Sequence, residues 1–231
     1  MAVDLDAQRA RVARALRGAM RANAGTRSRL LGVGGDALAA ATAANRAVAT
    51  SATRPAIERY TGVLYDALDH ATLPAGARRR LPSVLVVSGL WGLVGPADPI
   101  PDYKLKMGAS LGRFGRLATW WRGPVSERAQ ERADGATVWN LLPQEHAAAV
   151  DLGDRRQLSV TFLEPNTRGE LVAVSHWNKS LKGALVRHLL EHPTTDPDDL
   201  ADWDHPAGYR LDPSRTVEEG PRVRLAMVRA G

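Results

Sequence analysis

The sequence feature that most limits the fold is the stretch of residues 84–108, VLVVSGLWGLVGPADPIPDYKLKMG. It opens with a continuous apolar run at residues 84–87, bounded by Pro82 and Gly89, which is typical of a strand buried on both faces. The Gly- and Pro-rich residues 92–101 that follow exclude a helix or a central strand. A buried strand that leads into a long ordered loop is how many α/β proteins build a polar cleft.

The end of this stretch carries two lysines. Tyr103, Leu105 and Met107 alternate with Lys104 and Lys106, so an extended chain places the lysines on one face and the apolar residues on the other. The alternation predicts a pair of lysines that line a cleft. The alternative is an exposed strand edge that the lysines protect from pairing.

The composition is that of a folded protein, with 44% apolar and 24% charged residues among 231. This length suits one large domain or two small ones. The chain has no cysteine, which excludes disulfides, a thiol nucleophile and zinc–thiolate sites and predicts a cytoplasmic protein. No apolar stretch is long enough to span a membrane. The formal net charge of +6 favours a polyanionic partner, although a GC-rich genome also raises the arginine content.

Hydrophobic periodicity predicts a mixture of helices and strands. The predicted helices cover about residues 4–23 (ended by Gly25), 36–50, 55–73, 112–121, 124–133, 143–150, 178–192 (capped by Asn178) and 196–199. The predicted strands cover residues 84–87, 136–142, 157–164, 170–177 and 222–229, and those at 157–164 and 170–177 form a hairpin.

A glycine-rich turn lies between the first two predicted helices. Residues 27–38, RSRLLGVGGDAL, resemble the helix-hairpin-helix element of DNA-binding proteins. Gly32 and Gly34 let the backbone come close to a phosphate, and the next helix offers unpaired N–H groups and the positive end of its dipole. Arg27 and Arg29 would add sequence-independent charge contacts. The alternative is an ordinary turn between two helices that needs glycine for left-handed backbone.

Polar residues follow the predicted strand at residues 136–142. Asn140 and Glu145 lie at or just beyond its carboxyl end, where α/β proteins place functional groups. Each could equally be a cap or turn residue. Further along, Lys179 and Lys182 lie three apart near the start of a helix and project to nearly the same side. Lysines at that end oppose the helix dipole, which favours an anionic ligand for both.

His188 and His192 match the H-x-x-E-H pattern of inverted zinc peptidases. Pro193 follows at once, no third ligand is apparent, and cysteine is absent, so no metal is predicted. No G-x-S-x-G, P-loop or G-x-G-x-x-G motif is present, and no cofactor is predicted. No ligand spacing links the remaining histidines, His70, His146, His176 and His205.

Together these segments resemble the YaaA family, bacterial cytosolic proteins linked to peroxide stress. The resemblance spans about residues 55–212, and its long middle block is the most specific part. The matching motifs are Tyr60-Thr61-Gly62; Ser88-Gly89-Leu90-Trp91-Gly92-Leu93 with Pro96, Asp98 and Tyr103-Lys104-Leu105-Lys106-Met107-Gly108; Asn140-Leu141 with Glu145; Ser175, Lys179, Lys182, Gly183 and Arg187; and Gly208-Tyr209.

The resemblance implies a single mixed α/β domain over residues 1–231, with a partly buried mixed sheet flanked by helices and a helix-hairpin-helix-like segment at residues 26–50. It also implies a basic cleft, binding of double-stranded DNA and a role in limiting damage when peroxide meets reactive iron. No accepted enzymatic reaction comes with the family. The residues expected to bind DNA or phosphate are Arg27, Arg29, Gly32, Gly34, Lys104, Lys106, Asn140, Lys179, Lys182 and Arg187.

The start of the chain departs from the family pattern. Family members usually begin with an apolar strand and a loop bearing Pro, Ser and Lys, whereas this chain starts directly at a helix. Either the sequence is truncated or the strand has been lost, and a cleft lined by that loop would then be incomplete. A missing strand would also expose the edge of residues 84–87.

Three functions are therefore open. The first is a DNA-binding stress protein. The second is an enzyme that acts on a nucleotide or another anionic small molecule, with Glu145 and Lys104 as candidate catalytic residues and Asn140 orienting the substrate. The third is direct iron handling, which the lack of cysteine and of a His/carboxylate cluster disfavours. The sequence predicts no particular oligomeric state.

Overall fold

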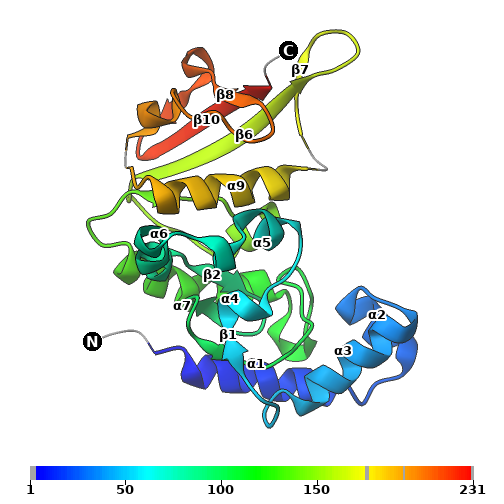
Figure 1. The fold of residues 1–231 in the computed structure, drawn as a ribbon. Helices are drawn as coiled ribbons and strands as arrows, with labels where there is room; N and C mark the ends of the chain where they lie inside the picture. The colour runs from blue at the N-terminus through cyan, green and yellow to red at the C-terminus, as the bar shows by residue number, and fades with distance from the viewer. Residues whose placement is uncertain (1–3, 175–176, 195, 230–231) are drawn as a thin grey trace. The chain divides into compact units, whose positions relative to one another are not determined.

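The structure is a computed structural model that describes residues 4–174, 177–194 and 196–229 (Figure 1). The chain divides into two compact units, each assembled from three separate stretches. Unit 1 comprises Met1–Arg59, Pro82–Asp134 and Leu142–Gly153, and unit 2 comprises Tyr60–Leu81, Gly135–Leu141 and Asp154–Gly231. The mixed α/β class is confirmed, while the assignment of residues 1–231 to one domain stays a prediction.

Unit 1 combines helices with two pairs of short antiparallel strands, β1 with β4 and β2 with β3. Its helices are α1 (Asp6–Ala19), α2 (Ala24–Leu31), α3 (Gly35–Ala47), α4 (Ala56–Arg59), α7 (Leu117–Arg132) and α8 (Gln144–Ala147), with a 3-10 turn η3 (Gly112–Phe114). Its strands are β1 (Arg54–Pro55), β2 (Val86–Ser88), β3 (Gly92–Val94) and β4 (Pro99–Ile100).

Helix α1 packs as its periodicity predicts, with Val12 and Leu16 fully buried. Its Arg9 side chain donates hydrogen bonds to the carbonyl oxygens of Trp91 (3.0 Å) and Leu93 (2.7 Å). These charge-assisted bonds join α1 to β3.

The predicted end of this helix at Gly25 is wrong, because Gly25 lies inside α2. Helix α1 ends at Ala19, and α2 begins at Ala24. The side chain of Asn23 caps α2 by accepting the N–H of Thr26 at 2.9 Å, a signal that outweighs the glycine.

The two helices predicted at residues 112–121 and 124–133 are one helix, α7, which runs through Gly123 and Pro124. Proline removes one hydrogen bond from a helix. Burial of a continuous apolar face outweighs that loss, because buried residues recur every four positions on both sides of the proline. They are Leu117, Trp121, Val125 and Ala129.

Two further sequence predictions fail in detail. The helix predicted over residues 55–73 is divided into α4 and α5 (Val63–Leu68), because Gly62 between them has a φ of 110°, which no helix contains. The strand predicted at residues 84–87 is displaced to β2, and Val86 is only half-buried. In the described chain β2 pairs with β3 alone, so residues 92–101 do contain strand.

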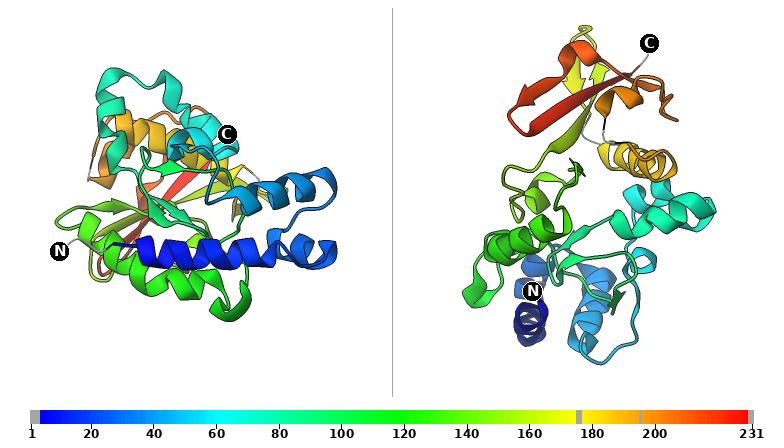
Figure 2. Two further views of the ribbon diagram at one scale, coloured as in Figure 1. Left: turned by 90° about the horizontal axis from the view of Figure 1, so that it is seen from below. Right: turned by 90° about the vertical axis from the view of Figure 1, so that its left-hand side faces the viewer.

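Unit 2 is built on a six-stranded mixed sheet in the order β5-β6-β10-β8, with β7 paired to β6 and β9 paired to β10. Strand β10 runs parallel to β6 and antiparallel to β8 and β9 (Figure 2). The strands are β5 (Val138–Trp139), β6 (Gln157–Pro165), β7 (Leu171–Ala173), β8 (Tyr209–Leu211), β9 (Val217–Glu219) and β10 (Arg222–Arg229). The helical elements are α5, η1 (His70–Thr72), α6 (Ala75–Arg80), α9 (Asn178–Glu191), η4 (Pro197–Leu200) and η5 (Pro213–Arg215), while η2 (Leu81–Ser83) lies at the junction of the two units.

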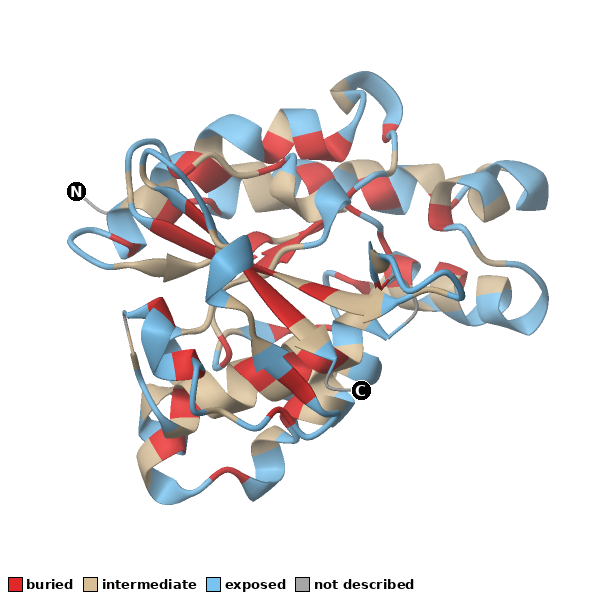
Figure 3. Ribbon diagram, turned by 90° about the horizontal axis from the view of Figure 1, so that it is seen from above, coloured by how far each residue is buried: buried red, intermediate tan, exposed pale blue. Residues whose placement is uncertain are grey.

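Helix α9 covers one face of this sheet (Figure 1). Leu181 and Leu185 of α9 pack with Leu158, Phe162 and Leu225 of β6 and β10 in one apolar core. Figure 3 shows these strands and the inner side of the helices as the buried part of the unit.

The β6–β7 hairpin is confirmed, although β7 covers only Leu171–Ala173 of the strand predicted at residues 170–177, of which 175–176 lie outside the described residues. Gly169 adopts a φ of 78° in its turn, and Asn166 Oδ1 accepts the N–H groups of Arg168 (2.8 Å) and Glu170 (3.0 Å). The predicted cap of α9 is wrong, because Asn178 is the first residue of the helix and no described side chain caps it.

Helices α9 and α5 approach closely at Gly183. A methyl group on Gly183 would lie against the carbonyl oxygen of Leu64, 3.0 Å from its carbonyl carbon and 2.9 Å from Cβ of Ala67. Only glycine fits at this crossing. None of the helices described is long and apolar enough to cross a membrane.

Candidate nucleic-acid interface

The predicted glycine turn does connect two helices, α2 and α3 (Figures 1 and 2). Gly32 ends α2 with a left-handed φ of 66°, and its N–H donates to the carbonyl of Ser28 at 2.7 Å. Gly34 precedes α3, which no described side chain caps, so the positive end of this helix is available to an anion. Both glycines are exposed, and a methyl group on Gly34 would meet no atom within 4 Å.

The side chain of Lys106 crosses this turn. A methyl group on Gly32 would clash with its Nζ and lie 2.6 Å from its Cε. Two of the predicted phosphate-binding residues, Gly32 and Lys106, are therefore in contact. The same segment approaches Gly89, where a methyl group would lie 3.0 Å from the carbonyl of Lys106.

Asn45, on the buried side of α3, holds the lysine segment in place. Its Oδ1 accepts the N–H of Lys104 and its Nδ2 donates to the carbonyl of Lys104, both at 2.9 Å. These are the two hydrogen bonds that a neighbouring strand would supply. Lys104 and Lys106 are exposed while Leu105 and Met107 are buried, so the predicted alternation is confirmed. Nothing in the sequence pattern singled out Asn45.

The two arginines of α2 make contacts close to their own helix. Arg27 donates to the carbonyl of Met20 at 3.5 Å, and its Nε is buried without a partner in the described structure. Arg29 is exposed and donates to Oγ1 of Thr26 at 3.2 Å. Their contribution to phosphate binding stays a prediction.

A second basic group in unit 1 was not predicted. The guanidinium carbon of Arg11 lies 5.8 Å from the ring centroid of Phe114 and 5.7 Å from that of Trp120, and Arg113 lies 5.8 Å from Phe114. Cation–π contact restrains these exposed arginines weakly, by about 0.5–1 kcal/mol for each contact. Neither forms an ion pair with the acids of the described chain. Arg11 lies far from Phe114 and Trp120 in the sequence, so no local pattern indicated this group.

Glu145 lies in the first turn of α8, as predicted, and is exposed. Its carboxylate covers Gly108, where a methyl group would lie 2.9 Å from the carboxylate carbon. A carboxylate beside the lysine segment is suited to proton transfer, and its catalytic role stays a prediction.

The predicted residues of unit 2 lie at the carboxyl end of β5 and on α9. Asn140 donates to Oε1 of Gln157 at 3.2 Å. Lys182 is half-buried and donates to the carbonyl of Leu141 at 3.2 Å, and this burial lowers the pKa of its ammonium group. Lys179 is exposed at the start of α9.

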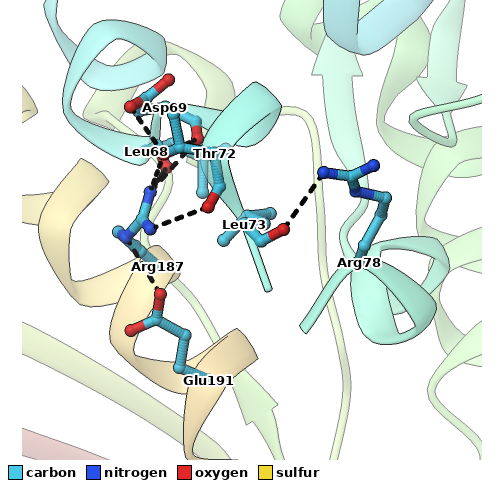
Figure 4. A network of polar contacts seen from close by, with 7 residues as sticks. All are labelled: Leu68, Asp69, Thr72, Leu73, Arg78, Arg187 and Glu191. Carbon is cyan, nitrogen blue, oxygen red and sulfur yellow. Dashed lines mark hydrogen bonds and ion pairs between the residues drawn. The ribbon is translucent and has the colours of Figure 1, made fainter. Parts of the chain in front are cut away.

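Arg187 of α9 is committed to a polar network (Figure 4). Its Nη1 donates to the carbonyls of Leu68 and Asp69, both at 3.2 Å, and to Oγ1 of Thr72 at 2.9 Å. Its Nε pairs with Glu191 at 3.0 Å. The guanidinium thereby caps the carboxyl end of α5, and a phosphate would have to displace these partners.

The H-x-x-E-H pattern forms no metal centre in the described chain, where no three His, Asp or Glu side chains are grouped to hold a metal. His188 stacks on Trp203, with ring centroids 4.3 Å apart and planes at 18°. Glu191 is paired with Arg187, and His192 lies just beyond the last residue of α9.

The predicted site residues are thus divided between the units. Ser175, one of the family-motif residues, and His176 lie outside the described residues. Unit 1 holds Arg27, Arg29, Gly32, Gly34, Lys104, Lys106 and Glu145, and unit 2 holds Asn140, Lys179, Lys182 and Arg187.

Comparison with known proteins gives one consistent relationship. The family model described as peroxide stress protein YaaA matches residues 3–215. A UPF0246 protein of Streptomyces coelicolor is 41% identical over 184 residues, covering 77% of this chain and 70% of the relative. A UPF0246 protein of Corynebacterium glutamicum is 36% identical, with 77% and 69% covered, and one of Cereibacter sphaeroides is 33% identical, with 75% and 70% covered. The chain therefore belongs to the YaaA family of peroxide stress proteins.

Proposed function

We propose that this protein is a cytoplasmic stress protein that binds duplex DNA without sequence preference through unit 1. The contact between Lys106 and the turn at Gly32 carries the proposal. It places the ammonium group of Lys106 at Gly32, two residues before Gly34 at the amino end of α3, which no described side chain caps. Both the ammonium group and the helix end attract a phosphate. The open space at Gly34 lets a phosphate approach the backbone.

The arginines that stack on Phe114 and Trp120 support the same function. Arg11 and Arg113 carry positive charge that no acid of the described chain neutralises. Because the rings restrain the side chains weakly, DNA binding would lose slightly less side-chain entropy there. Asp36, in the first turn of α3, acts in the opposite direction by repelling a phosphate.

Duplex DNA affinity is expected to fall steeply with salt, each phosphate contact contributing a slope of about −0.9 to the log–log plot of binding constant against salt. Gly34→Leu keeps the extended backbone (φ −132°) but blocks the end of α3, and we expect it to weaken binding roughly tenfold. Lys106→Ala should reduce the salt slope by about 1. Asp36→Asn should strengthen binding roughly twofold to fivefold. Fluorescence anisotropy with a labelled duplex measures all of them.

Arg79→Ala is the matched control, since it removes one exposed positive charge from α6 in unit 2. Its effect should stay well below that of Lys106→Ala. A salt slope near zero would remove phosphate contacts from the proposal. Wild-type affinity in both Gly34→Leu and Lys106→Ala would remove the turn as the anchoring site.

A second candidate is an enzyme that acts on a nucleotide or another anionic small molecule. The half-buried Lys182 favours this second function, because burial lowers the pKa of its amine. A lowered pKa makes a lysine better suited to act as a general acid or base. In unit 2, Asn140 directly precedes Leu141, whose carbonyl accepts the hydrogen bond of Lys182, and would orient the substrate. Glu145 and Lys104, which belong to unit 1, stay candidate catalytic residues from the sequence alone.

Thermal shifts across a panel of nucleotides and phosphorylated metabolites test this second function. A substrate or product should raise the unfolding temperature of the wild type more than that of Lys104→Ala or Lys182→Met, because each variant lacks one ammonium group. If every stabilising ligand acts equally on wild type and variants, the lysines take no part in binding and the enzyme hypothesis fails.

A further inference from the structure

Unit 2 contains a hollow that none of the functions above uses. It has a volume of about 430 Å³ and lies between α9, the end of α5 and residues 203–207. This volume is in the range of pockets that hold small organic ligands. The walls are largely apolar and include Ala67, Ala184, Trp203 and Pro206.

The charged groups at this hollow are already satisfied. Arg187 and Glu191 pair at 3.0 Å, and the remaining donors of Arg187 bind carbonyl and hydroxyl oxygens around the end of α5 (Figure 4). His205 accepts the N–H of Ala207 at Nδ1 (3.0 Å), so its Nε2 carries the proton and donates to the carbonyl of Leu181 (3.1 Å). The hollow therefore presents no uncompensated charge to a ligand.

Two polar side chains of the wall keep their hydrogen-bonding capacity. His188 lies flat on Trp203, and within the described residues neither of its ring nitrogens makes a hydrogen bond. Burial, followed by the neighbouring His192, lowers the pKa of His188 to about 4, so the ring is neutral at pH 7 and offers one donor and one acceptor. The hydroxyl of Ser180 adds a further donor and acceptor.

We propose that this hollow binds a neutral nitrogen heterocycle of nucleobase or nucleoside size, which packs against Trp203 and Pro206 and exchanges hydrogen bonds with His188 and Ser180. The ring of Trp203, which His188 already stacks on, forms one wall, and an aromatic wall favours a flat aromatic ligand. A neutral imidazole and a hydroxyl match the mixed donor and acceptor edge of a heterocycle better than a phosphate or carboxylate. The site is independent of DNA binding by unit 1, because it shares no residue with the glycine turn or the lysine segment.

Calorimetric titration of the full chain with adenosine, inosine, cytidine and uridine tests the proposal. At least one nucleoside should bind saturably, and AMP should bind more weakly than adenosine, because Arg187, the cation among the described lining residues, is already paired. His188→Phe keeps the stack on Trp203 but removes both ring nitrogens, and it should weaken binding about tenfold. Ala184→Leu and Ala207→Leu fill the hollow from opposite walls and should abolish binding.

His192→Phe is the matched control, since it changes the other histidine of the same motif and His192 does not line the hollow. It should bind like the wild type. Thermal unfolding of each variant shows whether it is folded. Because either Ala184→Leu or Ala207→Leu could fail to fold, the other keeps the test valid. The proposal is overturned if no nucleoside binds at millimolar concentration, if both filling variants bind normally, or if AMP binds as well as adenosine.

Discussion

Gly183→Ala is expected to lower the free energy of unfolding by about 2–3 kcal/mol, because the added methyl group has no room between α9 and α5. The added methyl group would clash with the carbonyl oxygen of Leu64 and lie 2.9 Å from Cβ of Ala67. The Leu64 oxygen belongs to the backbone of α5 and cannot move away as a flexible side chain could. Helix propensity alone predicts the opposite sign, a gain of about 1 kcal/mol for alanine over glycine inside a helix. The sign of the change therefore decides between packing and propensity.

Gly18→Ala is the control for this prediction. Gly18 also lies inside a helix, α1, but a methyl group there meets no atom within 4 Å. We expect it to raise the free energy of unfolding by about 0.5–1 kcal/mol. Urea unfolding followed by circular dichroism measures both variants. Equal stabilisation by Gly18→Ala and Gly183→Ala would mean that the helices do not cross at Gly183.

Asn45→Ala is expected to lower the free energy of unfolding by about 2–4 kcal/mol. Asn45 is fully buried, and its loss leaves both the N–H and the carbonyl of Lys104 without their partner. The loss also frees the segment that carries Lys106, so DNA affinity should fall as well. Chemical unfolding and duplex DNA binding report the two effects separately.

Thr42 provides the control on the same helix. It is buried on α3, and its hydroxyl has no partner within the described structure. Thr42→Val removes that unsatisfied group with little change of shape and is expected to raise stability by up to about 1 kcal/mol. If Asn45→Ala proves as harmless as Thr42→Val, the hydrogen bonds to Lys104 do not stabilise the fold.

The sequence correctly predicted the helices and strands that depend mainly on residues within the element itself. The β6–β7 hairpin follows from strict alternation and from Asn166 and Gly169 in its turn. Helix α9 follows from an apolar stripe that includes Leu181 and Leu185, and α1 from the stripe that includes Leu16. In each case the residues that define the element are its own.

The failures have long-range causes. Helix α7 continues through Pro124 because Trp121 and Val125 are buried by other segments, as shown by the bond from Trp121 Nε1 to the carbonyl of Gly89 at 2.9 Å. A sequence pattern around Pro124 contains no information about that partner. The strand predicted at residues 84–87 is shorter in the structure, because it pairs with β3, which is itself short. The glycines in and around β3 prevented its prediction from the sequence.

The candidate site was predictable to a similar extent. The exposure of Lys104 and Lys106 followed from alternation, and the turn at Gly32 followed from glycine spacing. The sequence could not show that Lys106 crosses Gly32. It also gave no sign of Asn45, because one asparagine in an alanine-rich helix does not name a partner far along the chain.

The central position of β10 affects how the protein is made on the ribosome. Strand β6 has the short parallel strand β5 on one side, and its other edge is covered by β10, from Arg222 to Val228, with which β8 and β9 also pair. During translation the nascent chain therefore carries an unprotected β6 edge until residues 222–228 have been synthesised. This unfinished sheet exposes the kind of strand edge that chaperones protect, and premature termination before residue 222 would leave the β6 edge open to aggregation.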